Sequence, residues 1–217
     1  MKILDLYAGI GGTAKGIHLA LKEAKIKHNY VAVECNLEIA RIHKENNPKS
    51  IVIEESVQSF LKRIGKTIYD FSFIWASPPC ETHSKCMLFW YGKEQFRKPS
   101  NELWELITTL RQIDIPFVVE NVIPYYRPPF RPTVKIDRHY FWSNFPLESF
   151  ETKNCPYELW ERVGQKYWEN FHGLKAIDTK SARSAVYYEI SKGIFEQFLN
   201  PIQYELTDFL EGVEQKT

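Results

Sequence analysis

The chain has 217 residues and a mass of 25.6 kDa, enough for one ordinary domain with at most a small appendage. Hydrophobic residues make up 44% and charged residues 25%, a balance that excludes an intrinsically disordered chain. The 28 Lys and Arg residues against 27 Asp and Glu residues give a net charge of +1, which excludes a strongly basic coating protein.

The sequence leads us to expect neither a targeting segment nor a cysteine framework. No apolar run reaches the roughly 20 residues of a membrane-spanning helix, and Asp5 interrupts the first apolar stretch, so we expect neither membrane association nor a secretory signal. The cysteines Cys35, Cys80, Cys86 and Cys155 have neither zinc-site spacing nor the pattern of a disulfide framework. We therefore expect a metal-free protein of the cytoplasm.

Short apolar runs alternate with helical patterns over the first 120 residues. Strands are predicted at 3–6, 30–33, 51–53, 71–76 and 117–119, and helices at 13–25, 38–46, 56–63 and 101–111. Unbroken apolar strands between helices are typical of a parallel sheet with helices on both faces. The sequence therefore predicts an open α/β fold, which binds its ligands at the carboxyl ends of the strands.

The pattern changes after Pro124. Residues 125–132 combine proline, aromatic side chains and arginine and predict an ordered loop, and residues 139–142 predict one more strand. Residues 146–180 are irregular, with one short helix expected near 157–167. A last helical pattern runs from Ser181 to Leu199, and a shorter acidic one follows.

A glycine-rich turn follows the first predicted strand. Gly9, Gly11 and Gly12 allow a tight turn and a close approach of the backbone to a ligand, beneath the start of the next helix. Glu34 follows the second strand, where α/β folds place a carboxylate on ribose hydroxyls. The glycine spacing differs from that of dinucleotide-binding turns, so the two features favour a cofactor with a single nucleoside.

Two reactive groups follow the fourth and fifth strands. Pro78 and Pro79 form a rigid turn that presents Cys80 at the sheet edge, although a free cysteine is more often a small buried hydrophobe than a nucleophile. Glu120 ends the apolar run of the fifth strand, and a carboxylate there is better placed in a cleft than buried without a partner. Both side chains are expected beside the cofactor.

With these residues in order, the chain resembles a compact, phage-type DNA (cytosine-5)-methyltransferase over about residues 1–145. The matching segments are Asp5–Gly12, Glu34, Pro78–Cys80, Glu120–Val122 and Arg138–Phe141. The resemblance implies a Rossmann-like, S-adenosylmethionine-dependent methyltransferase fold with a catalytic domain at 1–145. It also implies a reduced target-recognition segment at 146–180 and C-terminal helices at 181–217 that pack back on the catalytic domain.

The resemblance also implies roles for individual residues. Cys80 is expected to attack C6 of a flipped-out cytosine, Glu120 to hold or protonate N3, and Arg138 to contact O2 and orient Glu120. The expected contacts of S-adenosylmethionine are Tyr7, Ala8, Gly9, Ile10, Gly12, Glu34, Cys35, Ser56, Val57 and Pro79. The expected contacts of DNA are Ser84, Lys85, Lys93, Arg97, Asn121 and Arg131.

Basic stretches directly follow the cysteine and glutamate motifs. Residues 85–98 and 125–138 each hold four basic side chains against one acidic side chain. Because of their positions, we expect them to contact the phosphates of double-stranded DNA. Only 146–180 is available for target recognition, so we expect a short target sequence or dependence on a partner protein. We also expect a monomer.

Several positions depart from the family pattern. Ser56 stands where an aspartate usually binds the adenine amino group, and Glu81 replaces the glutamine after the nucleophile. Val134 and Ile136 replace the glutamine and the first arginine of the motif that ends in Arg138.

Three alternatives stay open from the sequence. An exocyclic-amino DNA methyltransferase shares the Ser77–Pro79 turn but has an aromatic residue at the position of Cys80. An RNA cytosine methyltransferase has the same catalytic motifs. A catalytically silent DNA-binding paralogue fits the short recognition segment, although the intact trio Cys80, Glu120 and Arg138 argues against it.

Overall fold

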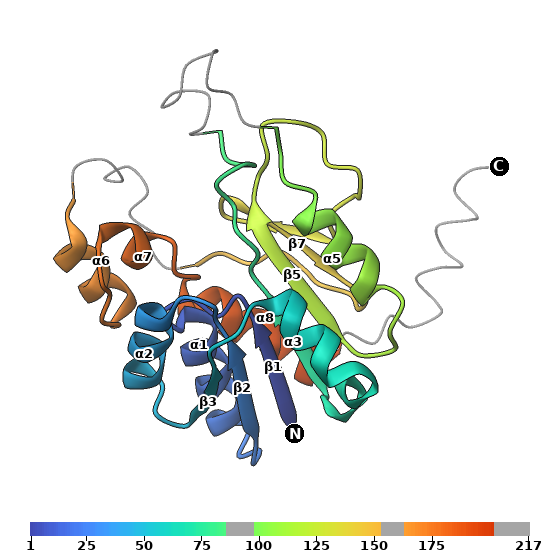
Figure 1. Cartoon of the computed structure of the whole chain (residues 1–217), viewed down its shortest axis with the longest axis horizontal. Coiled ribbons are helices and arrows are strands. Elements are labelled where there is room, and N and C mark those ends of the chain that lie inside the picture. The colour runs from blue at the N-terminus through green and yellow to red at the C-terminus, as the bar shows by residue number, and fades with distance from the viewer. Residues whose placement is uncertain (86–97, 153–162, 202–217) are drawn as a thin grey trace.

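The computed structural model describes residues 1–85, 98–152 and 163–201 (Figure 1). In these residues the strands are β1 (Lys2–Leu6), β2 (Asn29–Val33), β3 (Ser50–Ile53), β4 (Phe73–Ala76), β5 (Phe117–Val122), β6 (Val134–Ile136) and β7 (His139–Ser143). They form one sheet in the order β3-β2-β1-β4-β5-β7-β6. The first five pair in parallel, and β7 is antiparallel to both β5 and β6. The expected mostly parallel α/β fold is confirmed.

Helices cover both faces of the sheet (Figure 1). The described helices are α1 (Gly12–Glu23), α2 (Leu37–Asn46), α3 (Val57–Ile64), η1 (Gly65–Asp70, a 3₁₀ helix), α5 (Glu102–Leu110), α6 (Gln165–His172), α7 (Thr179–Arg183) and α8 (Tyr188–Leu199). α1 and α8 share a core with Trp75 on one face, whereas α3 and α5 share a core with Ile74 on the other. Trp75 and Ile74 have no exposed surface although they point to opposite faces of the sheet. Burial on both faces explains the unbroken apolar strand patterns.

β5 is longer than its apolar run predicts. Its antiparallel pairing with β7 continues as far as Val122 opposite His139, so Glu120 and Asn121 lie within the strand. β6 was not predicted as a separate strand, because an apolar–polar–apolar run of three residues is too short to distinguish from a loop.

The single helix expected from Ser181 to Leu199 is wrong, because the segment forms α7 and α8 instead. The chain between them crosses the start of α1, where a Cβ built on Gly12 would lie 2.1 Å from the carbonyl oxygen of Val186. A continuous helix does not provide this extended crossing. α8 then packs closely on α1, since a Cβ on Gly16 would lie 2.1 Å from Ser191 Oγ.

The short helix expected near 157–167 falls mostly outside the described residues. In the described part, α6 begins at Gln165 and continues to His172. No helix of the described ranges is long and apolar enough to cross a membrane. The same residues contain no group of three or more His, Cys, Asp or Glu side chains suited to a metal ion.

Candidate active site

Three parallel strands, β1, β2 and β4, end in register at one edge of the sheet, and the parallel pairing of β5 with β4 stops at the same level. Leu6 lies opposite Val33 and Ala76, and Ala76 lies opposite Val119. The residues that directly follow these four positions are Glu34, Tyr7, Ser77 and Glu120. The glycine-rich turn, the candidate ribose acid, the cysteine turn and the second acid therefore share one edge of the sheet.

The glycine-rich turn after β1 is built from left-handed backbone conformations. φ is +57° at Tyr7, +53° at Gly9 and +96° at Gly11. A Cβ built on Gly9 would meet no protein atom within 4 Å, so the chain leaves open space there. Glu34 lies beside this space, because its Oε2 accepts a hydrogen bond from the Gly9 amide at 3.1 Å. Its Oε1 accepts another from the Asn36 amide at 2.9 Å, which fixes the carboxylate.

Three side chains at the end of α2 hold three successive carbonyls of this turn. His43 Nδ1 donates to Gly9 (3.0 Å), Asn46 Nδ2 to Ile10 (2.9 Å) and Asn47 Nδ2 to Gly11 (3.1 Å). Burial lowers the pKa of His43, so its ring is neutral near pH 7 with the proton on Nδ1. Sequence reasoning missed all three, although their spacing places them on one side of α2.

Tyr7 is held by side chains from two other elements. Its hydroxyl donates a 2.7 Å hydrogen bond to Glu102 Oε1, and the Gln58 amide also donates to that oxygen. Burial, together with the Glu102 carboxylate, raises the pKa of Tyr7 well above its usual range. Glu102 begins α5 and Gln58 lies in α3, so the turn after β1 is connected to both helices.

The other predicted cofactor contacts lie in varied surroundings. Ala8 and Ile10 are buried, whereas Cys35 and Pro79 are exposed. Burial and the neighbouring Glu34 raise the pKa of the Cys35 thiol.

Three of the predicted cofactor contacts instead take part in capping or packing of the fold. Ser56 is the N-cap of α3, where its Oγ accepts a hydrogen bond from the Ser59 amide at 3.2 Å, and Val57 after it is buried. Gly12 faces the backbone of Val186.

The turn that carries Cys80 is fixed to β5. Asn121 Nδ2 donates a 2.8 Å hydrogen bond to the carbonyl oxygen of the buried Pro78. The Cys80 carbonyl accepts hydrogen bonds from the His83 and Ser84 amides, both at 3.0 Å, and the residue itself is half-buried. Asn121 is 1% exposed and thus holds this turn from inside the protein.

The chain after Cys80 packs against the loop after β5. His83 Nδ1 and the Tyr126 hydroxyl are hydrogen bonded at 2.5 Å, and the Tyr125 amide donates to the His83 carbonyl at 3.2 Å. Ser84 forms a β-bridge with Pro124. Burial lowers the pKa of His83, so this support is neutral near pH 7.

Glu120 lies against His139, a residue that sequence reasoning did not select. The Glu120 side chain is 10% exposed, and its Oε1 lies 3.5 Å from His139 Nε2. Arg138, the expected partner, is exposed in the turn between β6 and β7, where its carbonyl accepts a hydrogen bond from Ile123. Alternate residues of a strand share a face, so the pairing of Phe141 with Glu120 also brings His139 to that side.

The residues expected at DNA are only partly within the described chain. Lys93 and Arg97 lie outside it, whereas Lys85 and Arg131 are exposed and Ser84 is half-buried. In the described ranges, the exposed Arg127, Arg131 and Lys135 form no ion pair.

The segment containing α6 and α7 contacts both halves of the site. The Asn46 side chain donates to the Lys175 carbonyl (2.9 Å) and accepts from the Lys175 amide (2.8 Å). Lys180 forms an ion pair with Glu81, the residue after Cys80. This segment therefore contacts the support of the glycine-rich turn and the cysteine turn together.

A family model, C-5 cytosine-specific DNA methylase, matches residues 1–135. A curated relative, the tRNA (cytosine(38)-C(5))-methyltransferase of Spodoptera frugiperda, is 32% identical over 85 residues, 39% of this chain and 24% of that protein.

Solved structures with similarity include a mutant of Spodoptera frugiperda DNMT2 (29% identity, TM-score 0.39, 56% of this chain and 35% of that chain). Another is described as a DNA modification methyltransferase encoded within an E. coli prophage (20% identity, TM-score 0.41, 58% of this chain and 33% of that chain). The matches thus span about a quarter to a third of these relatives. Because the family model matches more than half of the residues of this chain, the chain belongs to the C-5 cytosine-specific DNA methylase family.

Proposed function

We propose that the chain transfers a methyl group from S-adenosylmethionine to C5 of a flipped-out cytosine in double-stranded DNA, with Cys80 as nucleophile. The observation that carries the proposal is the 2.8 Å hydrogen bond from Asn121 to Pro78. It joins the turn of Cys80 to the strand of Glu120, so the two residues lie on connected segments at the same edge of the sheet. Membership in the cytosine-5 methylase family supports the reaction class.

The turn after β1 fits S-adenosylmethionine. The open space at Gly9 suits a ligand that approaches the backbone closely, and the fixed carboxylate of Glu34 suits the two hydroxyls of a ribose. The amide groups at the start of α1 suit the carboxylate of the methionine part. When bound, S-adenosylmethionine supplies an electrophilic methyl group.

Cys80 and Glu120 would activate the cytosine base at two different atoms. A free thiol has a pKa near ~8.5, so only a small fraction is thiolate at neutral pH. The Cys80 thiolate would form a bond to C6 and displace an electron pair toward N3. The Glu120 carboxyl group would stabilise that pair by a hydrogen bond or a proton at N3. C5 would then acquire the methyl group, whose transfer leaves a neutral thioether on the cofactor. The C5 proton would leave to a base, N3 would return its proton to Glu120, and the Sγ–C6 bond would break to release thiolate and 5-methylcytosine.

Basic side chains near this edge would hold the nucleic acid. Lys85 follows the Cys80 turn, and Arg127 and Arg131 lie in the loop after β5. Phosphate contacts from these residues would offset part of the few kcal/mol needed to flip the base. We further propose that residues 146–180 form a reduced target-recognition segment. A short target sequence, in the setting of phage or restriction-related DNA modification, would suit its size.

An RNA substrate is the second candidate. The curated relative that is 32% identical over 85 residues is a tRNA (cytosine(38)-C(5))-methyltransferase, and the same chemistry serves either nucleic acid. The choice between DNA and tRNA depends on surfaces outside the shared motifs.

One assay separates these possibilities. The protein is incubated with S-adenosylmethionine carrying a labelled methyl group and either duplex DNA or tRNA, and the labelled nucleosides are then identified. We expect 5-methylcytosine in DNA, no label with Cys80→Ser, and normal labelling with Cys86→Ser, a cysteine that is not among the predicted site residues. Label in tRNA alone would favour the second candidate, and label on an exocyclic amino group would refute cytosine-5 chemistry. No label despite cofactor binding would indicate a silent paralogue.

A further inference from the structure

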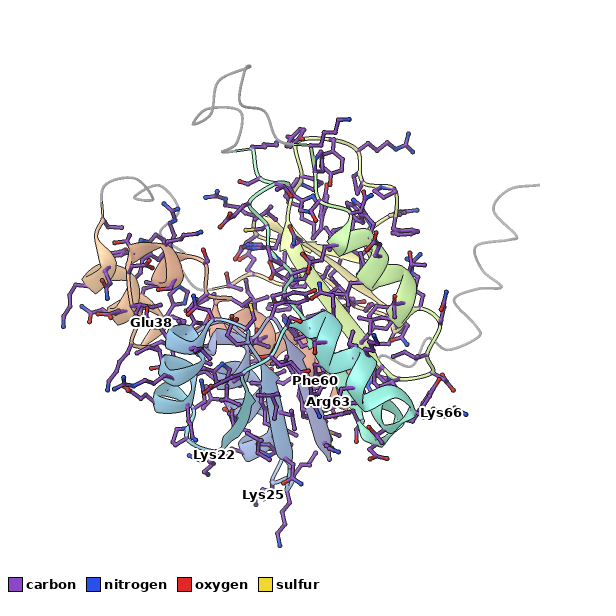
Figure 2. All side chains as sticks on the ribbon, in the orientation of Figure 1. Lys22, Lys25, Glu38, Phe60, Arg63 and Lys66 are labelled. Carbon is purple, nitrogen blue, oxygen red and sulfur yellow. The ribbon has the colours of Figure 1, made fainter. Side chains whose placement is uncertain are left out.

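A second charged site lies at the opposite edge of the sheet, away from the candidate active site. The turn from α1 to β2 and the turn from α2 to β3 border a cavity of about 750 Å³ there. Four lysine side chains, Lys22, Lys25, Lys27 and Lys49, line it, and His28 also borders it. Figure 2 shows Lys22 and Lys25 near the N-terminal end of β1. Five-residue strands separate the two edges by about 15 Å, because a strand rises roughly 3.3 Å per residue.

The four lysines are not neutralised by the protein. The cavity lining contains no carboxylate, and none of the four forms an ion pair within the described parts of the chain. Glu23, the acid next to Lys22 in the sequence, instead contacts Lys192 on α8 at 2.8 Å. Such a concentration of like charge disfavours the folded state unless an anion is bound.

Helix stabilisation explains only one of these lysines. Lys22 lies in the last turn of α1, where a positive charge interacts favourably with the helix dipole. Lys27 and Lys49 belong to two different loops and have no such role. Their convergence on one cavity therefore indicates an anion site.

His28, which borders the cavity, is hydrogen bonded within the protein. His28 Nδ1 donates to the Ile26 carbonyl (3.1 Å), and its Nε2 lies 2.7 Å from His18 Nδ1. His18 Nε2 in turn lies 3.1 Å from Ser50 Oγ. Burial lowers the pKa of His18 to about 4, so this ring is neutral at pH 7. Both nitrogens of His28 are thus engaged within the protein, which leaves the lysines to bind the ligand.

We propose that this lysine cavity binds the phosphodiester backbone of the nucleic-acid substrate, on a segment outside the one that enters the active site. The inference rests on the proposed function for the choice of a nucleic acid. Four separate ammonium groups around an open cavity suit several phosphates of one backbone, each contact releasing counterions. DNA and RNA share this chemistry, and the probes below distinguish them.

The test measures binding, independently of methyl transfer. Affinities for a duplex of about 30 base pairs and for a folded tRNA are measured by fluorescence anisotropy over a range of salt concentrations. The variant is Lys22→Glu with Lys25→Glu, and the matched control is Lys62→Glu with Lys66→Glu, which changes the net charge equally. Lys62 and Lys66 are exposed and do not line the cavity, and Figure 2 shows Lys66 away from Lys22 and Lys25.

We expect the cavity variant to bind at least one probe about tenfold more weakly or worse, with a salt slope lower by about two units. The control variant should keep the wild-type slope. The probe that responds identifies the source of the backbone. A milder pair, Lys27→Gln with Lys49→Gln, should lower the slope in the same direction, and this result guards against misfolding of the first variant.

An unchanged slope in both cavity variants, or an equal loss in the control, would overturn the inference. Hydrogen exchange supplies a second criterion, since residues 22–29 should gain protection with nucleic acid. If inorganic phosphate protects residues 22–29 but neither nucleic-acid probe does, the ligand would be a small anion. That result would also overturn the inference. If the slope falls but no methyl group is transferred, the proposed function fails while this inference stands.

Discussion

Asn121 donates a 2.8 Å hydrogen bond from its buried Nδ2 to the carbonyl oxygen of Pro78. The bond spans β4 and β5 at the edge where both strands end, and Cys80 follows Pro78 by two residues. A buried carbonyl that loses its partner costs about 1–3 kcal/mol. The bond is therefore important for stability and for the position of the thiol.

Asn121→Ala should separate these two effects. We expect a loss of about 1–3 kcal/mol in unfolding free energy, measured in urea, and a larger fall in methyl transfer than in S-adenosylmethionine affinity. Asn144→Ala is the matched control. Asn144 bonds Ile115 and Phe117 at the other end of β5, both at 2.9 Å, so its loss should affect stability alone. Equal rates per folded molecule in the two variants would make Asn121 purely structural.

Glu34→Ala should weaken S-adenosylmethionine binding by about 1–3 kcal/mol, because the ribose hydroxyls lose a charged acceptor and the Gly9 amide loses its partner. Isothermal calorimetry measures this directly. Glu38→Ala, an exposed acid of α2, removes the same charge nearby and should leave the affinity almost unchanged. Normal binding by a folded Glu34→Ala protein would remove Glu34 from the cofactor site.

The sheet was largely predictable because its strands are buried on both faces. Such strands need unbroken apolar runs, as in Phe73–Ala76, and these runs are visible in one sequence. The polar residues that interrupt them, Glu34 and Glu120, mark the common edge. The site residues that the pattern predicted therefore come from the ends of strands.

The supports of the site were not predictable by the same reasoning. His43 and Asn46 act on the loop through tertiary contacts, and a polar residue at a helix end is equally well explained by local capping. His139 was missed because the motif directed attention to Arg138, whereas strand register decides which residue faces Glu120. The break before α8 lies against Gly12, which is distant in the sequence, and local periodicity does not reveal such a contact.

Asp5 should make the stability depend on pH. Burial raises its pKa from 3.8 to about 8, despite a 2.8 Å hydrogen bond from the Tyr30 hydroxyl. Between these values the folded chain retains a proton that the unfolded chain releases, so stability falls as pH rises through this window. Asp5→Asn stays neutral, so its unfolding free energy relative to wild type should increase from about pH 5 to about pH 8. The exposed Asp70→Asn serves as control, and a difference independent of pH would contradict the assignment.

Arg131→Ala should reduce the salt dependence of DNA binding. If this exposed residue contacts one phosphate, the slope of log affinity against log salt should fall by about one unit. Arg63→Ala removes an arginine that pairs with Glu55 at 2.7 Å and should leave the slope unchanged. Equal slopes for wild type and Arg131→Ala would show that this part of 125–138 is ordinary surface.

Covalent catalysis by Cys80 is testable with DNA that carries 5-fluorocytosine at the target. Fluorine does not leave as a proton does, so the enzyme should remain attached through the Sγ–C6 bond when S-adenosylmethionine is present, and the adduct should survive denaturing electrophoresis. Cys80→Ser should abolish the adduct because a hydroxyl is far less ionised than a thiol, whereas Cys86→Ser should retain it. Glu120→Gln should form it more slowly with normal cofactor affinity, because an amide cannot protonate N3. Normal methylation by the Cys80→Ser enzyme would refute the cytosine-5 mechanism and favour transfer to an exocyclic amino group.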